Sequence, residues 1–140
     1  IMDNLGLDTS ALALQTYADA ELLVFQNRFD EAFAKLDSLK KTFPGHELED
    51  DIVYLKADIY LKLRRYGEAA DAYQYILDTY EESIRLDNSL WALAGLYENQ
   101  LNDLPKAKEL YERLFIDYSG SILAVEARKK YRELRGDSVQ

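Results

Sequence analysis

Residues 66–80 read YGEAADAYQYILDTY, and this stretch decides the fold. Apolar residues recur in it at steps of 3, 4, 3 and 4, so they share one face of a helix. They are Tyr66, Ala69, Tyr73, Ile76 and Tyr80. The same steps occur earlier, at Phe29, Ala32, Leu36, Leu39 and Phe43, and later, at Leu104, Ala107, Tyr111, Leu114 and Tyr118. The shared alanines lie 37 and 38 residues apart, which indicates an internal repeat.

A second helix precedes each copy of this pattern. It centres on a small residue, Ala20, Ala57 or Ala94, which lies 12, 12 or 13 residues before the shared alanine. Two helices approach closely where both carry small side chains, and larger side chains then fill the gaps around them. Each unit is therefore predicted to be a helical hairpin with a short polar turn.

Helix breakers follow the first and third hairpins, at residues 44–45 and 119–120, whereas the linker after Tyr80 has none. We predict an all-α, right-handed solenoid that forms a single domain over residues 1–140. Its parts are hairpins at about 13–46, 50–83 and 87–120 and a capping helix at 121–135. The expected helices are 9–27, 30–43, 48–64, 67–80, 84–101, 105–117 and 121–135. The predicted core consists of the repeated alanines and their apolar neighbours, including Leu23, Phe29, Tyr60 and Tyr97.

These alanines and aromatic residues resemble the tetratricopeptide repeat. The matching positions are Ala20, Ala32, Leu36, Leu39 and Pro44, then Ala57, Tyr60, Ala69, Tyr73 and Ile76, and finally Ala94, Tyr97, Ala107, Tyr111 and Leu114. The chain departs from the motif at Asp19 and Lys56, where leucine is usual, and at Glu81 and Ser119, where proline is usual. The resemblance implies a non-catalytic scaffold that binds a peptide or a protein partner along its concave face.

The units are a few residues longer than the nominal repeat of about 34 residues. With the Tyr-Ser-Gly-Ser linker at 118–121, they resemble bacterial cell-envelope repeat proteins. Examples are the outer-membrane assembly lipoprotein and the Tol-Pal-associated coordinator. This divergent bacterial subclass favours the cell envelope or periplasm over the cytoplasm. The chain opens at Ile1 rather than at an initiator methionine, and we expect it to be a piece of a longer protein.

Composition excludes several classes of function. The chain has 140 residues, with 17 basic and 26 acidic side chains and a net charge of −9. This charge disfavours nucleic-acid binding, because phosphate backbones are repelled. There is no cysteine and only one histidine, His46, so thiolate and two-histidine sites are excluded. No apolar run reaches the ~18 residues of a membrane span.

The first helix of each hairpin is predicted to line the inner surface. Tyr17, Tyr54 and Trp91 lie 37 residues apart and form an aromatic ladder, with Lys129 at the same phase. Other residues at inner positions are Glu21, Asp51, Asp58, Leu61, Gly95 and Glu98. These residues predict a groove for a partner segment that carries basic and apolar side chains. The alternative is that the rings pack between neighbouring helices and expose only an edge.

Other features have simpler interpretations. The carboxylates at 47–51 suit a hard cation, but they open a helix, where acidic residues complement the dipole. Basic residues in the final helix suit a polar cap, yet the contrast with the acidic first half also permits head-to-tail self-association. No catalytic motif occurs, so we expect neither an enzyme nor a cofactor or metal.

The alternative to the groove is a structural or oligomerisation module that packs on its parent chain or on itself.

Overall fold

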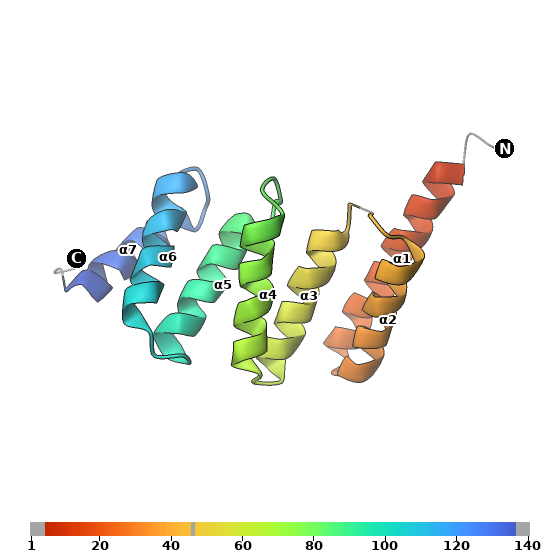
Figure 1. Ribbon diagram of the computed structural model, residues 1–140, viewed down its shortest axis with the longest axis horizontal. Coiled ribbons are helices and arrows are strands. Elements are labelled where there is room, and N and C mark those ends of the chain that lie inside the picture. Colours follow the sequence, from red (N-terminus) through yellow and green to blue (C-terminus); the bar gives the residue numbers. More distant parts are fainter. Residues whose placement is uncertain (1–4, 46, 137–140) are drawn as a thin grey trace.

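The computed structural model describes residues 5–45 and 47–136, and these residues form a row of helices stacked side by side (Figure 1). No strand occurs within these two ranges. The helices are α1 (Leu5–Phe25), α2 (Phe29–Thr42), α3 (Glu49–Lys62), α4 (Tyr66–Thr79), α5 (Leu86–Asn99), α6 (Leu104–Asp117) and α7 (Ala124–Arg135). The all-α solenoid predicted from the repeat is confirmed. His46 lies outside the described residues.

The hairpins close through similar turns, of which the third is one residue longer than the other two. Asn27, Arg64 and Asn102 follow the first helix of each hairpin and have φ values of 61°, 60° and 55°. In this left-handed conformation a following N–H reaches back over the helix end, as from Arg28 to the Leu23 carbonyl at 2.8 Å. These turns end α1, α3 and α5 about two residues earlier than the sequence predicts. Asparagine tolerates this conformation well, whereas arginine is strained in it.

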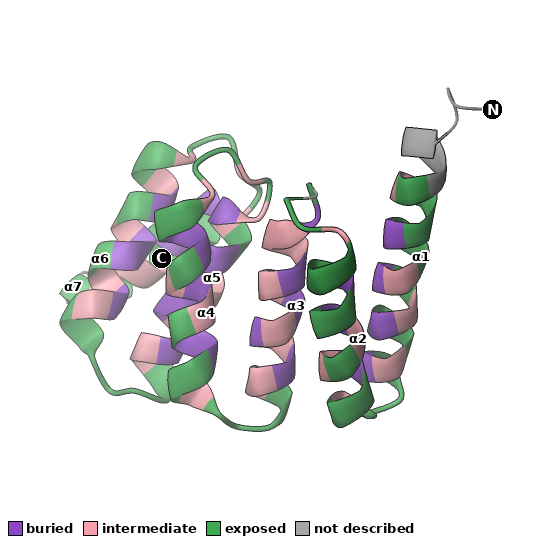
Figure 2. Ribbon diagram, turned by 45° about the vertical axis from the view of Figure 1, so that its right-hand side comes forward, coloured by how far each residue is buried: buried purple, intermediate pink, exposed green. Residues whose placement is uncertain are grey.

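The core forms where the two helices of a hairpin cross. The six repeated alanines have no solvent exposure, as predicted, and large side chains such as Tyr73, Tyr111, Leu36 and Ile76 fill the space around them. They are Ala20, Ala32, Ala57, Ala69, Ala94 and Ala107. Figure 2 shows the buried residues on the sides of the helices that face their neighbours. Leu23, Phe29, Tyr60 and Tyr97 are only half-buried, because they lie at the edges of these faces.

The core divides into two clusters. One joins α1 and α2 to the near face of α3 through Leu48, Ile52, Leu55 and Ile59. The other begins on the opposite face of α3, at Ala57, and continues through α4, α5, α6 and α7. The third helix therefore contributes to both clusters, one on each side.

Hydrogen bonds from side chains fix the linkers between hairpins. The Ser83 hydroxyl donates to Asp50 Oδ2 at 2.5 Å, and the Ser121 hydroxyl donates to Asp87 Oδ2 at 2.6 Å. Each serine oxygen also accepts an N–H two residues later, from Arg85 at 2.9 Å and from Leu123 at 3.1 Å. The linker after Tyr80 needs neither proline nor glycine, because the hydrogen bonds of Ser83 hold its backbone.

The last helix is a polar cap. Its C-terminal residue is followed by Gly136, which has a φ of 94° and caps the helix. Ala124 and Ala127 are its buried residues, whereas Glu126, Arg128 and Lys129 are exposed. Over the described ranges, no helix combines the length and apolarity that a membrane crossing requires.

Candidate partner-binding surface

The predicted inner residues of α1, α3 and α5 belong to the first helix of each hairpin. We call them the A-helix face: Tyr17, Glu21, Asp51, Tyr54, Asp58, Trp91 and Glu98. Contacts between successive first helices hold this face together. The Tyr17 hydroxyl donates to the backbone oxygen of Asp51 at 3.3 Å, which joins α1 to α3.

The aromatic ladder is more closed than the sequence predicts. Tyr17 is only 8% exposed, because α3 covers it, and burial holds the pKa of its hydroxyl well above the usual range. Tyr54 and Trp91 are half-buried. Each packs edge-to-face on a tyrosine of the following helix, with ring centres 5.6 Å and 5.5 Å apart. Tyr17 is thus not part of an open stripe, and the other two rings present only partial surfaces.

Arg85 joins the face from the linker before α5, and the sequence patterns did not identify it. Its Nε lies 2.8 Å from Asp51 Oδ1, and its guanidinium stands 4.8 Å from the centre of the Tyr54 ring. Its charge also acts on the Tyr17 hydroxyl. The sequence did not indicate this contact because Asp51 and Arg85 are 34 residues apart and Arg85, placed in the predicted helix 84–101, lies just before α5 in the structure.

The carboxylates of the face differ in their partners. Glu98 accepts from the Tyr111 hydroxyl at 2.8 Å and pairs with Lys130 Nζ at 3.4 Å. Asp58 accepts from the Tyr73 hydroxyl at 2.9 Å, and burial raises the pKa of its carboxyl. Neither Asp58 nor the exposed Glu21 forms an ion pair with any described residue.

The structure therefore brings the first half of the predicted site together. Glu21, Asp51, Asp58 and Arg85 all act electrostatically on the Tyr17 hydroxyl. Trp91 and Glu98 meet instead through Tyr111, farther along the stack.

The remaining predicted residues lie around these two groups. Leu61 is half-buried and packs on the core. A Cβ placed on Gly95 would meet nothing within 4 Å, so the surface there is open. Lys129 is exposed on α7 and lies 3.7 Å from Glu126.

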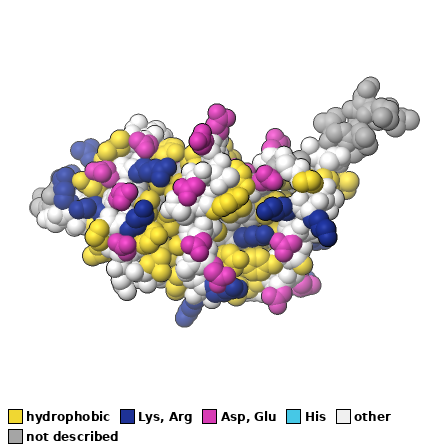
Figure 3. Space-filling model, in the orientation of Figure 1, with side chains coloured by type: hydrophobic (Ala, Val, Ile, Leu, Met, Phe, Trp, Pro, Cys, Tyr) yellow, Lys and Arg dark blue, Asp and Glu magenta, His cyan; other side chains and the backbone are white. Residues whose placement is uncertain are grey.

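Charges of both signs are interspersed with hydrophobic side chains over the face shown in Figure 3. One hollow of about 450 Å³ lies between α2, α3 and α4, away from the A-helix face. Its lining is Lys40, Val53, Lys56, Tyr60, Glu68, Asp71, Ala72 and Tyr75. This hollow has no counterpart among the sequence predictions.

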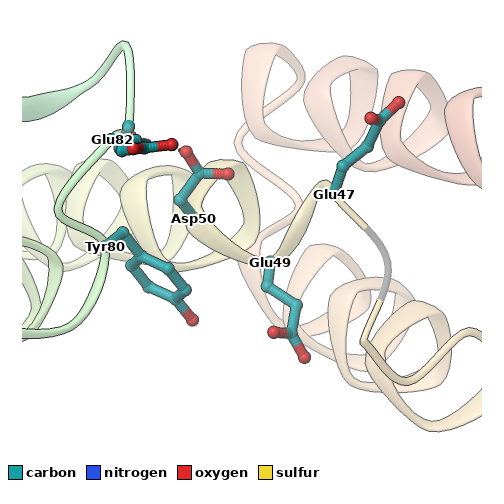
Figure 4. Close-up of a pocket in the computed structure, with 6 residues that line it drawn as sticks. Glu47, Glu49, Asp50, Tyr80 and Glu82 are labelled. Carbon is teal, nitrogen blue, oxygen red and sulfur yellow. Dashed lines mark hydrogen bonds between the residues drawn. The ribbon is translucent and has the colours of Figure 1, made fainter.

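An acidic hollow of about 340 Å³ lies at the linkers beside the start of α3. Its carboxylates do not converge: Asp50 and Glu82 point toward one another, whereas Glu47 and Glu49 point to opposite sides (Figure 4). Asp50 already accepts from Ser83, and Glu49 accepts from the Gly45 N–H at 3.2 Å. Within residues 5–45 and 47–136, no three His, Cys, Asp or Glu side chains are arranged to hold a metal ion.

Comparison with known proteins agrees with the repeat. The sequence model of the tetratricopeptide repeat matches residues 17–84 and again residues 54–122. The two matches overlap by one hairpin and together span all three. A search of curated proteins found no match. The cell-envelope subclass therefore stays a prediction from the linker residues alone.

Proposed function

Because the chain belongs to the tetratricopeptide-repeat family, we propose that it binds a basic and apolar segment of a partner protein along the A-helix face. Repeats of this family generally serve as protein–protein interaction modules and are typically non-catalytic. The partner's chemistry and its position on the A-helix face are our proposal.

The observation that carries the proposal is the pair Glu21 and Asp58. Both carboxylates lie near the Tyr17 hydroxyl, and neither has an ion-pair partner among the described residues. Arg85 is already engaged by Asp51, so negative charge prevails at this point of the face. A lysine or arginine of a partner would supply the missing charge. Its neighbouring apolar side chains would cover the half-buried ring of Tyr54 and, farther along, that of Trp91.

The test compares two fluorescent peptides. One alternates leucine with lysine, and the other has glutamate in place of every lysine. We expect binding of the lysine peptide only, detected by anisotropy and by the emission of Trp91, the chain's single tryptophan. The double variant Glu21→Gln, Asp58→Asn should weaken binding about tenfold, which corresponds to ~1.4 kcal/mol.

Asp30→Asn is the matched control, because Asp30 is exposed on α2, away from the A-helix face. It should leave the affinity unchanged. Equal binding of both peptides, or an equal loss in the Asp30→Asn variant, would show that the A-helix face does not select basic segments.

A second proposal concerns the compartment of the protein. We propose the bacterial cell envelope on the linker resemblance alone, and fractionation of cells expressing the full parent protein tests it. Recovery with the cytoplasmic fraction would contradict it.

A further inference from the structure

The first helix is apolar on two opposite sides. Ala13, Tyr17, Ala20 and Val24 face the core and are buried. The exposed side of α1, which lies at the end of the row (Figure 2), carries a second apolar stripe. It consists of Ala11, Leu14, Ala18, Leu22 and Phe25, and we call it the α1 stripe. Leu14 and Leu22 are 55% exposed and Phe25 is 85% exposed. An apolar face of a helix is normally covered by another element.

The repeat shows what this stripe is equivalent to. Moving forward by 37 residues takes Ala11, Ala18 and Leu22 to Leu48, just before α3, and to Leu55 and Ile59 in α3. Those three residues are buried against the first hairpin. The other two stripe residues, Leu14 and Phe25, correspond to the charged Asp51 and Lys62. The α1 stripe thus includes part of the face by which a first helix docks on a neighbouring hairpin. Within the described residues, nothing docks on it.

The order of large and small residues in the stripe fits a second copy of itself. Two antiparallel α1 helices related by a two-fold axis at Ala18 would place Ala11 opposite Phe25 of the copy. Leu14 would then lie opposite Leu22 of the copy, and the two Ala18 residues would meet at the axis. In each pair the two residue numbers sum to 36, so a single two-fold axis at Ala18 relates all of the pairs. Small residues lie opposite the largest one and at the centre, which permits close approach of the two helices.

Charge is compatible with this pairing. The stripe itself carries no charged residue, so the pairing buries no charge between the two helices. The opposite end of the solenoid is less suited to the stripe. The exposed part of α7 carries Glu126, Arg128 and Lys129, whose charges would be buried against apolar side chains.

We propose that the chain forms a two-fold symmetric dimer in solution through the α1 stripe, with the two α1 helices antiparallel. From Ala11 to Phe25 the helix rises only about 21 Å. The paired surface is therefore smaller than a standard interface, and the dimer is weak, with dissociation in roughly the micromolar range. This proposal does not depend on the A-helix face, since Leu22 lies outside that face.

Sedimentation velocity over a range of protein concentrations tests the dimer. We expect a concentration-dependent dimer that persists in high salt, because the contact is apolar. Leu22→Glu should abolish it. Leu12→Glu is the matched control: Leu12 is 61% exposed on the same helix, but it points away from the stripe, so the dimer should persist.

Cross-linking tests the geometry. The chain has no cysteine, so Ala18→Cys introduces a single thiol at the proposed axis. We expect Ala18→Cys to give a disulfide-linked dimer under mild oxidation and Leu12→Cys to remain largely monomeric. Circular dichroism checks that each variant is folded.

Three outcomes would overturn the proposal. A protein that is monomeric at every concentration would show that the α1 stripe does not bind a second copy. The stripe would then be a surface for something else, such as a further hairpin of a longer chain. A dimer lost in high salt would point to head-to-tail contact through the charged ends. A dimer lost in Leu12→Glu but kept in Leu22→Glu would place the contact on another side of α1. Binding of the lysine peptide is also measured with the Leu22→Glu variant. This measurement separates failure of the dimer proposal from failure of the proposed function.

Discussion

Ser89→Ala should make the protein more stable, although it removes a polar side chain from the core. Ser89 lies in α5 one turn from Leu86 and Leu93, and it has no solvent exposure. Its hydroxyl oxygen has no hydrogen-bond partner among the described residues. Burying such a group without a partner costs about 1–3 kcal/mol. Alanine also favours a helix over serine by roughly 0.5 kcal/mol.

We therefore expect the free energy of unfolding to rise by about 1–2 kcal/mol, or ~3–6 °C in melting temperature for a chain of this size. Urea unfolding followed by circular dichroism measures it. Ser38→Ala is the control, because Ser38 is exposed in the middle of α2 and reports helix propensity alone. The difference between the two variants isolates the buried hydroxyl. A Ser89→Ala protein less stable than the parent would refute the reasoning and show that the hydroxyl is hydrogen-bonded, for example to a buried water.

Three further predictions concern stability. Arg64→Asn should stabilise the second hairpin turn by about 0.5–1 kcal/mol in urea unfolding, because asparagine tolerates the left-handed conformation that strains arginine. Asp58→Asn should raise stability at neutral pH but not near pH ~3. Burial raises the pKa of the Asp58 carboxyl in the folded state, so its contribution is favourable at low pH and is lost as the pH rises through that pKa. The Tyr73 hydroxyl can still donate to the asparagine oxygen, and thermal melts at both pH values check this. Ala107→Leu should cost about 1–3 kcal/mol through overpacking at a helix crossing, whereas Ala34→Leu, on the exposed side of α2, should cost little. Equal melting temperatures for these two variants would contradict the hairpin alignment.

The repeat predicted the hairpins because their determinants are local. Each crossing point needs a small residue at a fixed step, and six alanines fulfil that requirement without exception. Helix ends were less accurate, since they depend on backbone conformations such as that of Arg64, which the residue type does not favour. The start of α1 at Leu5 was missed because no repeat position marks it.

The candidate surface was predicted only in outline. Periodicity gives the direction of a side chain from its helix, but not whether a neighbouring helix covers it. Tyr17 has the right phase for an open groove, and α3 closes over it. Arg85 was predicted to lie inside the helix 84–101, but it reaches the surface from the linker before α5, and helical periodicity does not indicate that contact. The serine–aspartate bonds were detectable in principle, because Ser83 and Ser121 are separated by nearly one repeat, as are Asp50 and Asp87.

The division of the core at α3 determines how the solenoid should come apart under mechanical force. Because the two clusters lie on opposite faces of this one helix, each keeps most of its own contacts when the other loses its order. A molecule stretched between its ends should therefore lengthen in separate steps. The smaller cluster, which holds α1 and α2 against α3, should yield first, and the four helices that follow α3 should still resist as one body. The first hairpin then acts as an extensible element in series with a stiffer remainder.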